Sequence, residues 1–137
     1  ETVHAFIKNV QETIDQLDTN NPSQLSISIH LKNSLDALNS AVAWMIETFQ
    51  KQPGQAAAGA TSFLEMMGLI SGGWMLARGV IEADMQLKNK QGDKNFLNSK
   101  ITTAQYFSQA FLSRAPSLLY PITDCGDCVM EFEASNF

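Results

Sequence analysis

The sequence predicts an all-α fold, an antiparallel four-helix bundle with an irregular C-terminal tail. Apolar residues recur at three- and four-residue steps in four segments, the spacing that places them on one face of a helix. The connections between these segments are short and rich in turn-forming residues, which favours antiparallel neighbours. Only two of the 137 residues are cysteine, so we expect apolar packing to hold residues 1–137 together as a single helical-bundle domain.

The first helix is expected over residues 2–17. Its apolar face consists of Val3, Phe6, Ile7, Val10, Ile14 and Leu17. Residues 18–23 follow as a turn, because their short polar side chains compete for backbone hydrogen bonds and Pro22 blocks continuation of the helix.

The second helix is the clearest, and Ser23 or Ser26 is expected to cap it. Apolar residues alternate in steps of four and three along it, as in the seam of a helical bundle. This seam consists of Leu31, Leu35, Leu38, Val42, Met45 and Phe49. The helix is expected to end at residues 51–54, which contain Pro53 and Gly54.

An alanine-rich run opens the third helix, which is expected to extend to about Lys88. Its apolar positions are Phe63, Met66, Met67, Ile70, Trp74, Ala77 and Ile81. Gly68, Gly72 and Gly73 disfavour a helix interior and need a reason. Close packing of another helix or of a ring such as Trp44 is one explanation, which we favour, and a kink at residues 71–73 is the other.

A polar loop over residues 89–94 precedes the fourth helix. The apolar positions of this helix are Phe96, Leu97, Ile101, Ala104, Phe107, Phe111, Leu112 and Ala115. Pro116 is expected to cap or interrupt it. Residues 120–137 show no sustained helical period, so we expect a packed irregular end.

The composition excludes several classes of function. The chain is 45% apolar and 17% charged with a net charge of −5, and it carries no basic patch that could follow a phosphate backbone, so no nucleic-acid partner is expected. Its apolar runs are too short for a membrane span. The first residues do not resemble a signal peptide, and we expect a cytoplasmic protein and a piece cut from a longer chain.

Cys125 and Cys128 have the two-residue spacing of zinc sites and redox dithiols. A structural zinc site needs four ligands, and His4 and His30 are the only histidines. Redox pairs of the thioredoxin kind lie at a helix N-terminus beside parallel strands, which this sequence does not predict. A structural role is therefore the favoured interpretation of both cysteines.

His30 invites comparison with histidine phosphotransfer domains, which are also helical bundles. In those domains a lysine follows the histidine at the third position and a glycine one turn later, whereas here Lys32 follows at the second position and no such glycine is present. A structural histidine is the favoured interpretation. Glu47, Glu65 and Glu82 lack the histidine three residues on that a bundle di-metal site requires, and we expect Glu65 and Glu82 to face solvent.

Five methionines could line an adaptable groove, although filling the core is the commoner use of this side chain. They are Met45, Met66, Met67, Met75 and Met85.

Three blocks in the second half bring a family to mind. Residues 63–78 run from a phenylalanine-leucine start through Gly73 and Trp74 into small residues, and residues 100–107 and 113–115 follow. This order resembles the C-terminal domain of long bacterial acyl-CoA dehydrogenases, a group that includes 3-methylmercaptopropionyl-CoA dehydrogenase-like enzymes. Val129, Met130 and Phe137 resemble the end of that domain. The likeness runs from about residue 30 to the end, with Ser113 in place of the usual proline, and the pair Cys125 and Cys128 is not a motif of the family.

The resemblance implies a parent flavoprotein that binds FAD and oxidises acyl-CoA thioesters in fatty acid metabolism. Its catalytic base and flavin site would lie in the preceding dehydrogenase domains of the same chain, and this domain would pack on them. The parent enzyme would be a homo-oligomer. No catalytic, cofactor-binding or metal-binding residue is carried over to this segment. The alternative is a stand-alone helical-bundle binding or phosphotransfer module, in which His30 or an exposed methionine groove would carry the function.

Overall fold

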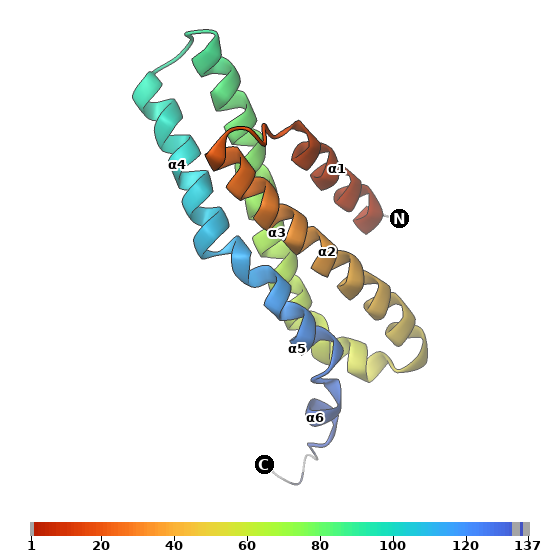
Figure 1. The fold of residues 1–137 in the computed structure, drawn as a ribbon. Coiled ribbons are helices and arrows are strands. Elements are labelled where there is room, and N and C mark those ends of the chain that lie inside the picture. Colours follow the sequence, from red (N-terminus) through yellow and green to blue (C-terminus); the bar gives the residue numbers. More distant parts are fainter. Residues whose placement is uncertain (1, 133–134, 136–137) are drawn as a thin grey trace.

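A computed structural model describes residues 2–132 and 135, and every regular element in this part of the chain is helical. The all-α class is therefore confirmed. The α-helices, labelled in Figure 1, are α1 (Thr2–Gln16), α2 (Pro22–Lys51), α3 (Pro53–Lys88), α4 (Lys94–Ala110), α5 (Leu119–Thr123) and α6 (Gly126–Met130). The 3₁₀ helix η1 (Leu112–Leu118) connects α4 to α5. Within the described residues, no helix is long and apolar enough to cross a bilayer.

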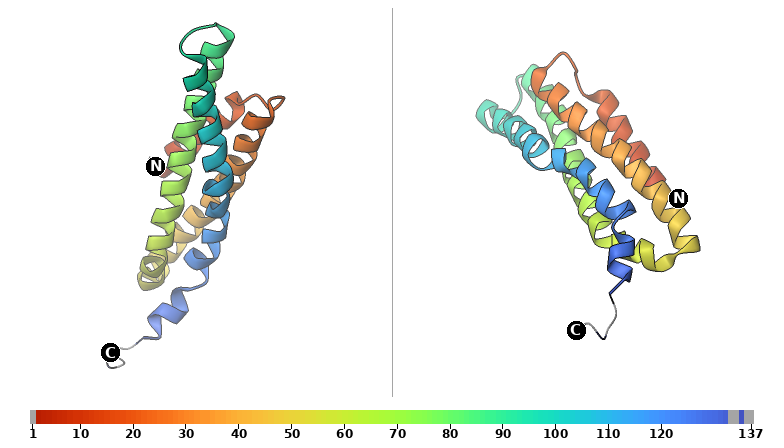
Figure 2. Two further views of the ribbon diagram at one scale, coloured as in Figure 1. Left: turned by 90° about the vertical axis from the view of Figure 1, so that its left-hand side faces the viewer. Right: turned by 60° about the horizontal axis from the view of Figure 1, so that its bottom comes forward.

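Three long helical segments form the body of the molecule: α2, α3, and the run of α4, η1 and α5. α3 runs back along α2 after a turn at Gln52, and α4 runs back along α3, with η1 and α5 continuing in the same direction (Figures 1 and 2). α1 packs on α2 and α3, on the side away from α4. The core lies between these helical segments and includes the fully buried side chains of Leu31, Leu38, Met66 and Ile70.

Three residues of the expected apolar faces are exposed. Phe49 is 68% exposed, Phe96 is 61% exposed and Phe111 is 38% exposed. Phe49 has the helical direction of Leu31, but it lies in the last turn of α2, where no neighbouring element in the described part of the chain covers its ring. Phe96 lies in the first turn of α4, beside an open groove. Periodicity predicts the direction of a side chain and does not predict whether a partner covers it.

The cap of α2 differs from the expected one. Asn21 caps the helix, because its Oδ1 accepts hydrogen bonds from the backbone N of Ser23 at 3.0 Å and of Gln24 at 3.3 Å. Pro22 occupies the first helical position, where a missing N–H costs nothing. Ser23 and Ser26 as caps were wrong predictions. Ser23 lies inside the first turn, and its hydroxyl donates to the side-chain oxygen of Gln105 at 3.0 Å.

The C-terminal segment is more regular than expected. α4 ends at Ala110, and Ala115 and Pro116 lie in the 3₁₀ helix that follows. α5 and α6 are short helices within the tail that we expected to be irregular. Helices this short gain their stability from packing, and the side chain of Ile122 in α5 is fully buried. The predicted match at Phe137 lies outside the described residues.

Gly68, Gly72 and Gly73 are the α3 glycines for which the sequence required a reason, and close packing explains two of them. A Cβ on Gly72 would lie 3.1 Å from Cζ of Phe107, and one on Gly73 would lie 2.8 Å from Cδ2 of Leu112. The ring is therefore that of Phe107 and not that of Trp44. α3 continues as one helix through residues 71–73. A Cβ on Gly68 would meet nothing within 4 Å, so internal packing does not explain this glycine.

Candidate functional site

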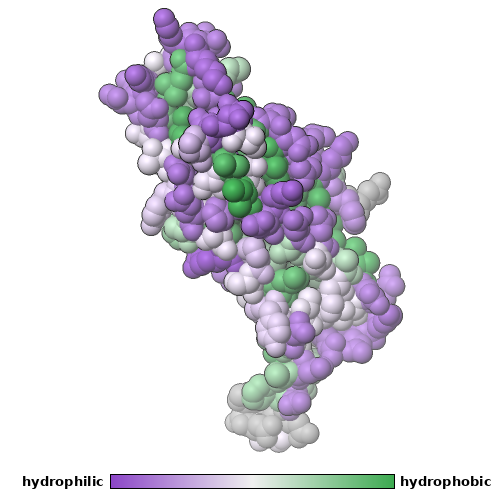
Figure 3. Space-filling view, viewed as in Figure 1, coloured by the Kyte–Doolittle hydropathy of each residue, from purple (hydrophilic) through white to green (hydrophobic). Residues whose placement is uncertain are grey.

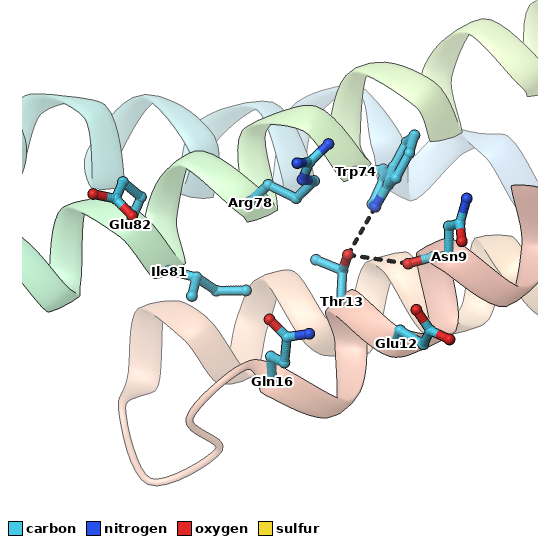
Figure 4. A pocket seen from close by; sticks show the side chains of 8 residues that line it. All are labelled: Asn9, Glu12, Thr13, Gln16, Trp74, Arg78, Ile81 and Glu82. Carbon is cyan, nitrogen blue, oxygen red and sulfur yellow. Dashed lines mark hydrogen bonds between the residues drawn. The ribbon is translucent and has the colours of Figure 1, made fainter.

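A polar crevice of about 430 Å³ lies between α1 and α3 (Figure 4). Its walls are Asn9, Glu12, Thr13, Gln16, Trp74, Arg78, Ile81 and Glu82. Residues at three- and four-residue steps of each helix line it, so the two walls arise from one face of α1 and one face of α3. The crevice brings together carboxylates, amides and a guanidinium with an indole ring.

Trp74 is the centre of the crevice and links its two walls. Its Nε1–H donates to Oγ1 of Thr13 at 2.8 Å, and the Thr13 hydroxyl donates to the carbonyl oxygen of Asn9 at 3.1 Å (Figure 4). The ring of Phe6 meets the indole edge to face, with centroids 5.5 Å apart. The guanidinium of Arg78 lies 5.5 Å from the indole centroid. The indole N–H thus has a hydrogen-bond acceptor, and the ring contacts Phe6 and Arg78. The contacts with Thr13 and Phe6 hold α1 against α3.

Removing the acceptor for the indole is expected to weaken this attachment. Thr13→Val should lower the free energy of unfolding by about 1 kcal/mol, because the half-buried indole N–H loses its hydrogen-bond partner. Thr102→Val is the matched control, since Thr102 makes the same bond to a carbonyl one turn earlier but accepts none from an indole. Urea unfolding measures both variants, and equal losses would contradict the role of Thr13.

The carboxylates of the crevice already have partners. Glu82 accepts a hydrogen bond from Nε2 of Gln86 at 2.7 Å, and Glu12 lies 3.8 Å from Nζ of Lys8. Glu82 and Glu65 are both exposed, as expected. The crevice therefore offers polar surface, with its acids engaged in neighbouring pairs on their own helices.

Among the described residues, two carry a shifted pKa, and both belong to ion pairs outside the crevice. A hydrogen bond from Lys51 at 2.6 Å, together with its charge, lowers the pKa of Glu47. A hydrogen bond to Asp84, with the charge of this carboxylate, raises the pKa of Lys88. Glu47, Lys51 and Lys88 are all exposed, so these pairs contribute little to stability.

His30 lies on the side of α2 that faces α4. Ser26, one turn before it, accepts a hydrogen bond from Gln109 at 3.1 Å. Ser34, one turn after it, is fully buried, and its hydroxyl lies 3.2 Å from the carbonyl oxygen of Leu112. His30 between them is half-buried. A phosphotransfer histidine has to meet a partner protein, and this packed position favours the structural interpretation.

Cys125 is half-buried, Cys128 is exposed, and both carry free thiols. Their segment is fastened to the start of α3, since Gln55 donates a hydrogen bond to Asp127 and a Cβ on Gly126 would lie 3.3 Å from Cβ of Gln55. Within residues 2–132 and 135, no group of three or more His, Cys, Asp or Glu side chains is placed to hold a metal ion.

The methionines divide between core and surface. Met66 is fully buried, and Met45 and Met67 pack against the core. Met75 and Met85 are 56% and 49% exposed, so they do not fill the core. Sequence reasoning missed the pairing of Thr13 with Trp74, because these residues are 61 positions apart and neither has a local spacing signal.

Fold and crevice together define an all-α domain in which polar side chains connect neighbouring helices. The model of the family described as acetyl-CoA dehydrogenase C-terminal like matches residues 6–133, and the chain belongs to this family. It is also similar to 3-methylmercaptopropionyl-CoA dehydrogenase of Ruegeria pomeroyi, with 29% identity over 129 residues. This similarity covers 94% of the chain and 22% of that enzyme, so the chain spans less than a quarter of its curated relative.

Proposed function

We propose that this chain is the non-catalytic C-terminal helical domain of a flavin-dependent acyl-CoA dehydrogenase. In this proposal the preceding domains bind FAD and oxidise an acyl-CoA thioester, and the helical domain packs on them or at a subunit interface. The observation that carries the proposal is how much of each chain is similar. Nearly the whole of this chain matches about one fifth of a dehydrogenase, and the matched family describes the C-terminal part of such enzymes.

The interior of the domain supports a packing role. Polar groups connect helices to one another, as the hydrogen bonds of Thr13 with α3, of Ser23 with α4 and of Ser34 with η1 illustrate. As part of the proposal, α1 to α4 act as an antiparallel four-helix bundle that presents a rigid surface to the catalytic domains. A rigid surface keeps a neighbouring active site in place without contributing a reacting group.

Three further properties belong to the proposed parent enzyme. FAD would be its cofactor, a homo-oligomer its assembly and the cytoplasm its location, each inferred from the family. A single chain would then carry the flavin site and this domain, connected covalently, as expected for domains of this size in a longer polypeptide.

The native protein tests the proposal directly. An antibody raised to residues 1–137 should capture from the source cells a yellow polypeptide several times longer than this chain, with FAD bound. Addition of an acyl-CoA thioester should bleach the flavin absorbance as the flavin is reduced. A companion variant that lacks residues 1–137 should keep a flavin that acyl-CoA bleaches, because in this proposal the reacting groups lie upstream.

A colourless native protein no longer than this chain would overturn the proposal. The stand-alone alternative would then predict transfer of a phosphoryl group from a radiolabelled donor, with loss of the label in His30→Ala. Loss of acyl-CoA bleaching in a folded, flavin-loaded variant without residues 1–137 would instead overturn the non-catalytic role.

A further inference from the structure

An apolar groove of about 350 Å³ lies between α3 and α4, on a different side of α3 from the polar crevice. Its walls are Met75, Leu76, Gly79, Phe96, Ser99, Lys100 and Thr103. Figure 2 shows α3 and α4 side by side along this edge of the molecule. The groove is thus built on two long helices, a rigid support for a docking partner.

Large apolar side chains stand exposed on both sides of the groove. Met75 is 56% exposed on α3, and Phe96 is 61% exposed on α4. Lys100 is the charged residue of the groove, and its Nζ lies 5.1 Å from the centroid of the Phe96 ring. On the face of the molecule seen in Figure 3, hydrophobic residues form small patches separated by hydrophilic ones. An apolar groove with one lysine at its rim fits an apolar helix that also presents a carboxylate.

The floor of the groove is open at Gly79. A Cβ on Gly79 would meet nothing within 4 Å, and the same is true of Gly68, which lies on the same edge of α3. Leu64, one turn before Gly68, is 72% exposed. Glycine disfavours the interior of a helix, and no contact within the described residues explains these two. An outside backbone or side chain that approaches α3 closely would use the space that they leave.

We propose that a helix of the dehydrogenase domains that precede Glu1 in the full-length chain docks in this groove, with an apolar side chain over Gly79 and a carboxylate beside Lys100. The inference rests on the proposed function. Most of the related enzyme lies outside this segment, which covers 22% of it. Covalent connection gives the preceding domains a high effective concentration at the groove, which a second copy of this chain lacks.

Photo-cross-linking in the full-length, flavin-loaded enzyme tests the occupant. Met75→p-benzoylphenylalanine places the probe at the groove, and Ile29→p-benzoylphenylalanine places it on an apolar α2 residue of similar exposure, 48%. Mixed light and isotopically heavy subunits distinguish a cross-link within one chain from one between chains. The expected product joins residue 75 to the preceding domains of the same chain, with no such product from residue 29.

Gly79→Phe should abolish this cross-link, because the added ring fills the groove, while its Cβ meets nothing within 4 Å. A cross-link that persists in Gly79→Phe, one formed only between chains, or no cross-link from residue 75 would each overturn the docking site. A product from residue 29 alone would overturn the site and leave the proposed function standing. The proposed function itself fails separately, on the size and flavin content of the native protein.

Discussion

Gly59→Val is expected to lower the free energy of unfolding by about 3 kcal/mol, the upper part of the range for an overpacked interior. A Cβ on Gly59 would lie 2.7 Å from the carbonyl oxygen of Ile122 and 3.3 Å from its Cα. Both atoms are backbone, so they cannot move aside as a side chain would. Relief requires α5 to shift away from α3, which exposes the buried side chain of Ile122. Urea unfolding followed by far-UV circular dichroism measures the loss.

Gly68→Val is the matched control on the same helix. A Cβ at Gly68 meets nothing within 4 Å, so valine there should raise the free energy of unfolding by about 0.4 kcal/mol through its better helix propensity. Opposite signs for the two substitutions would support the contact between α3 and α5. If both variants gained stability, the close approach of Ile122 to Gly59 would be wrong.

Ile70→Ala is expected to cost about 3 to 4 kcal/mol, within the range for removing a large aliphatic side chain from a core. Ile70 is fully buried on α3 and belongs to the main core cluster. Helices pack closely around Ile70, so the neighbouring side chains can fill only part of the cavity that the substitution to alanine creates. The same unfolding measurement detects this as a shift of the urea midpoint without a change of slope.

Leu64→Ala provides the comparison, because Leu64 is 72% exposed on the same helix. In the 137-residue chain it should change stability by no more than about 0.5 kcal/mol. Similar losses for Ile70→Ala and Leu64→Ala would mean that α3 presents a different face to the core.

The helices were predictable because their signals are local. The steps between Leu31, Leu35, Leu38 and Val42 predict one buried face of α2, and all four side chains are buried. Pro53 and the polar loop before α4 predict two of the connections, at Gln52 and before Lys94. The order of residues 63–78 also predicted a dehydrogenase C-terminal domain, and the family match over residues 6–133 confirms it.

The cap at Asn21 could not be predicted, because several neighbouring residues are equally suitable N-caps. Asn21, Ser23 and Ser26 can all cap a helix, and the choice depends on Pro22 at the first helical position. The serines left over take other roles, because α4 lies within hydrogen-bonding reach of both Ser23 and Ser26. A pattern in one segment contains no information about which neighbour will supply a partner.

The sequence alone determined the helical class, the C-terminal ends of α2 and α3 and the family, because these depend on spacing, on turn residues and on order along the chain. Tertiary structure alone decided the pairing of Thr13 with Trp74, the approach of Ile122 to Gly59 and the open floor at Gly79. The first two are contacts between residues far apart in sequence, and the third is a position that no distant residue covers. Helical periodicity sets the direction in which a side chain points, whereas only the packing of whole helices sets what it meets.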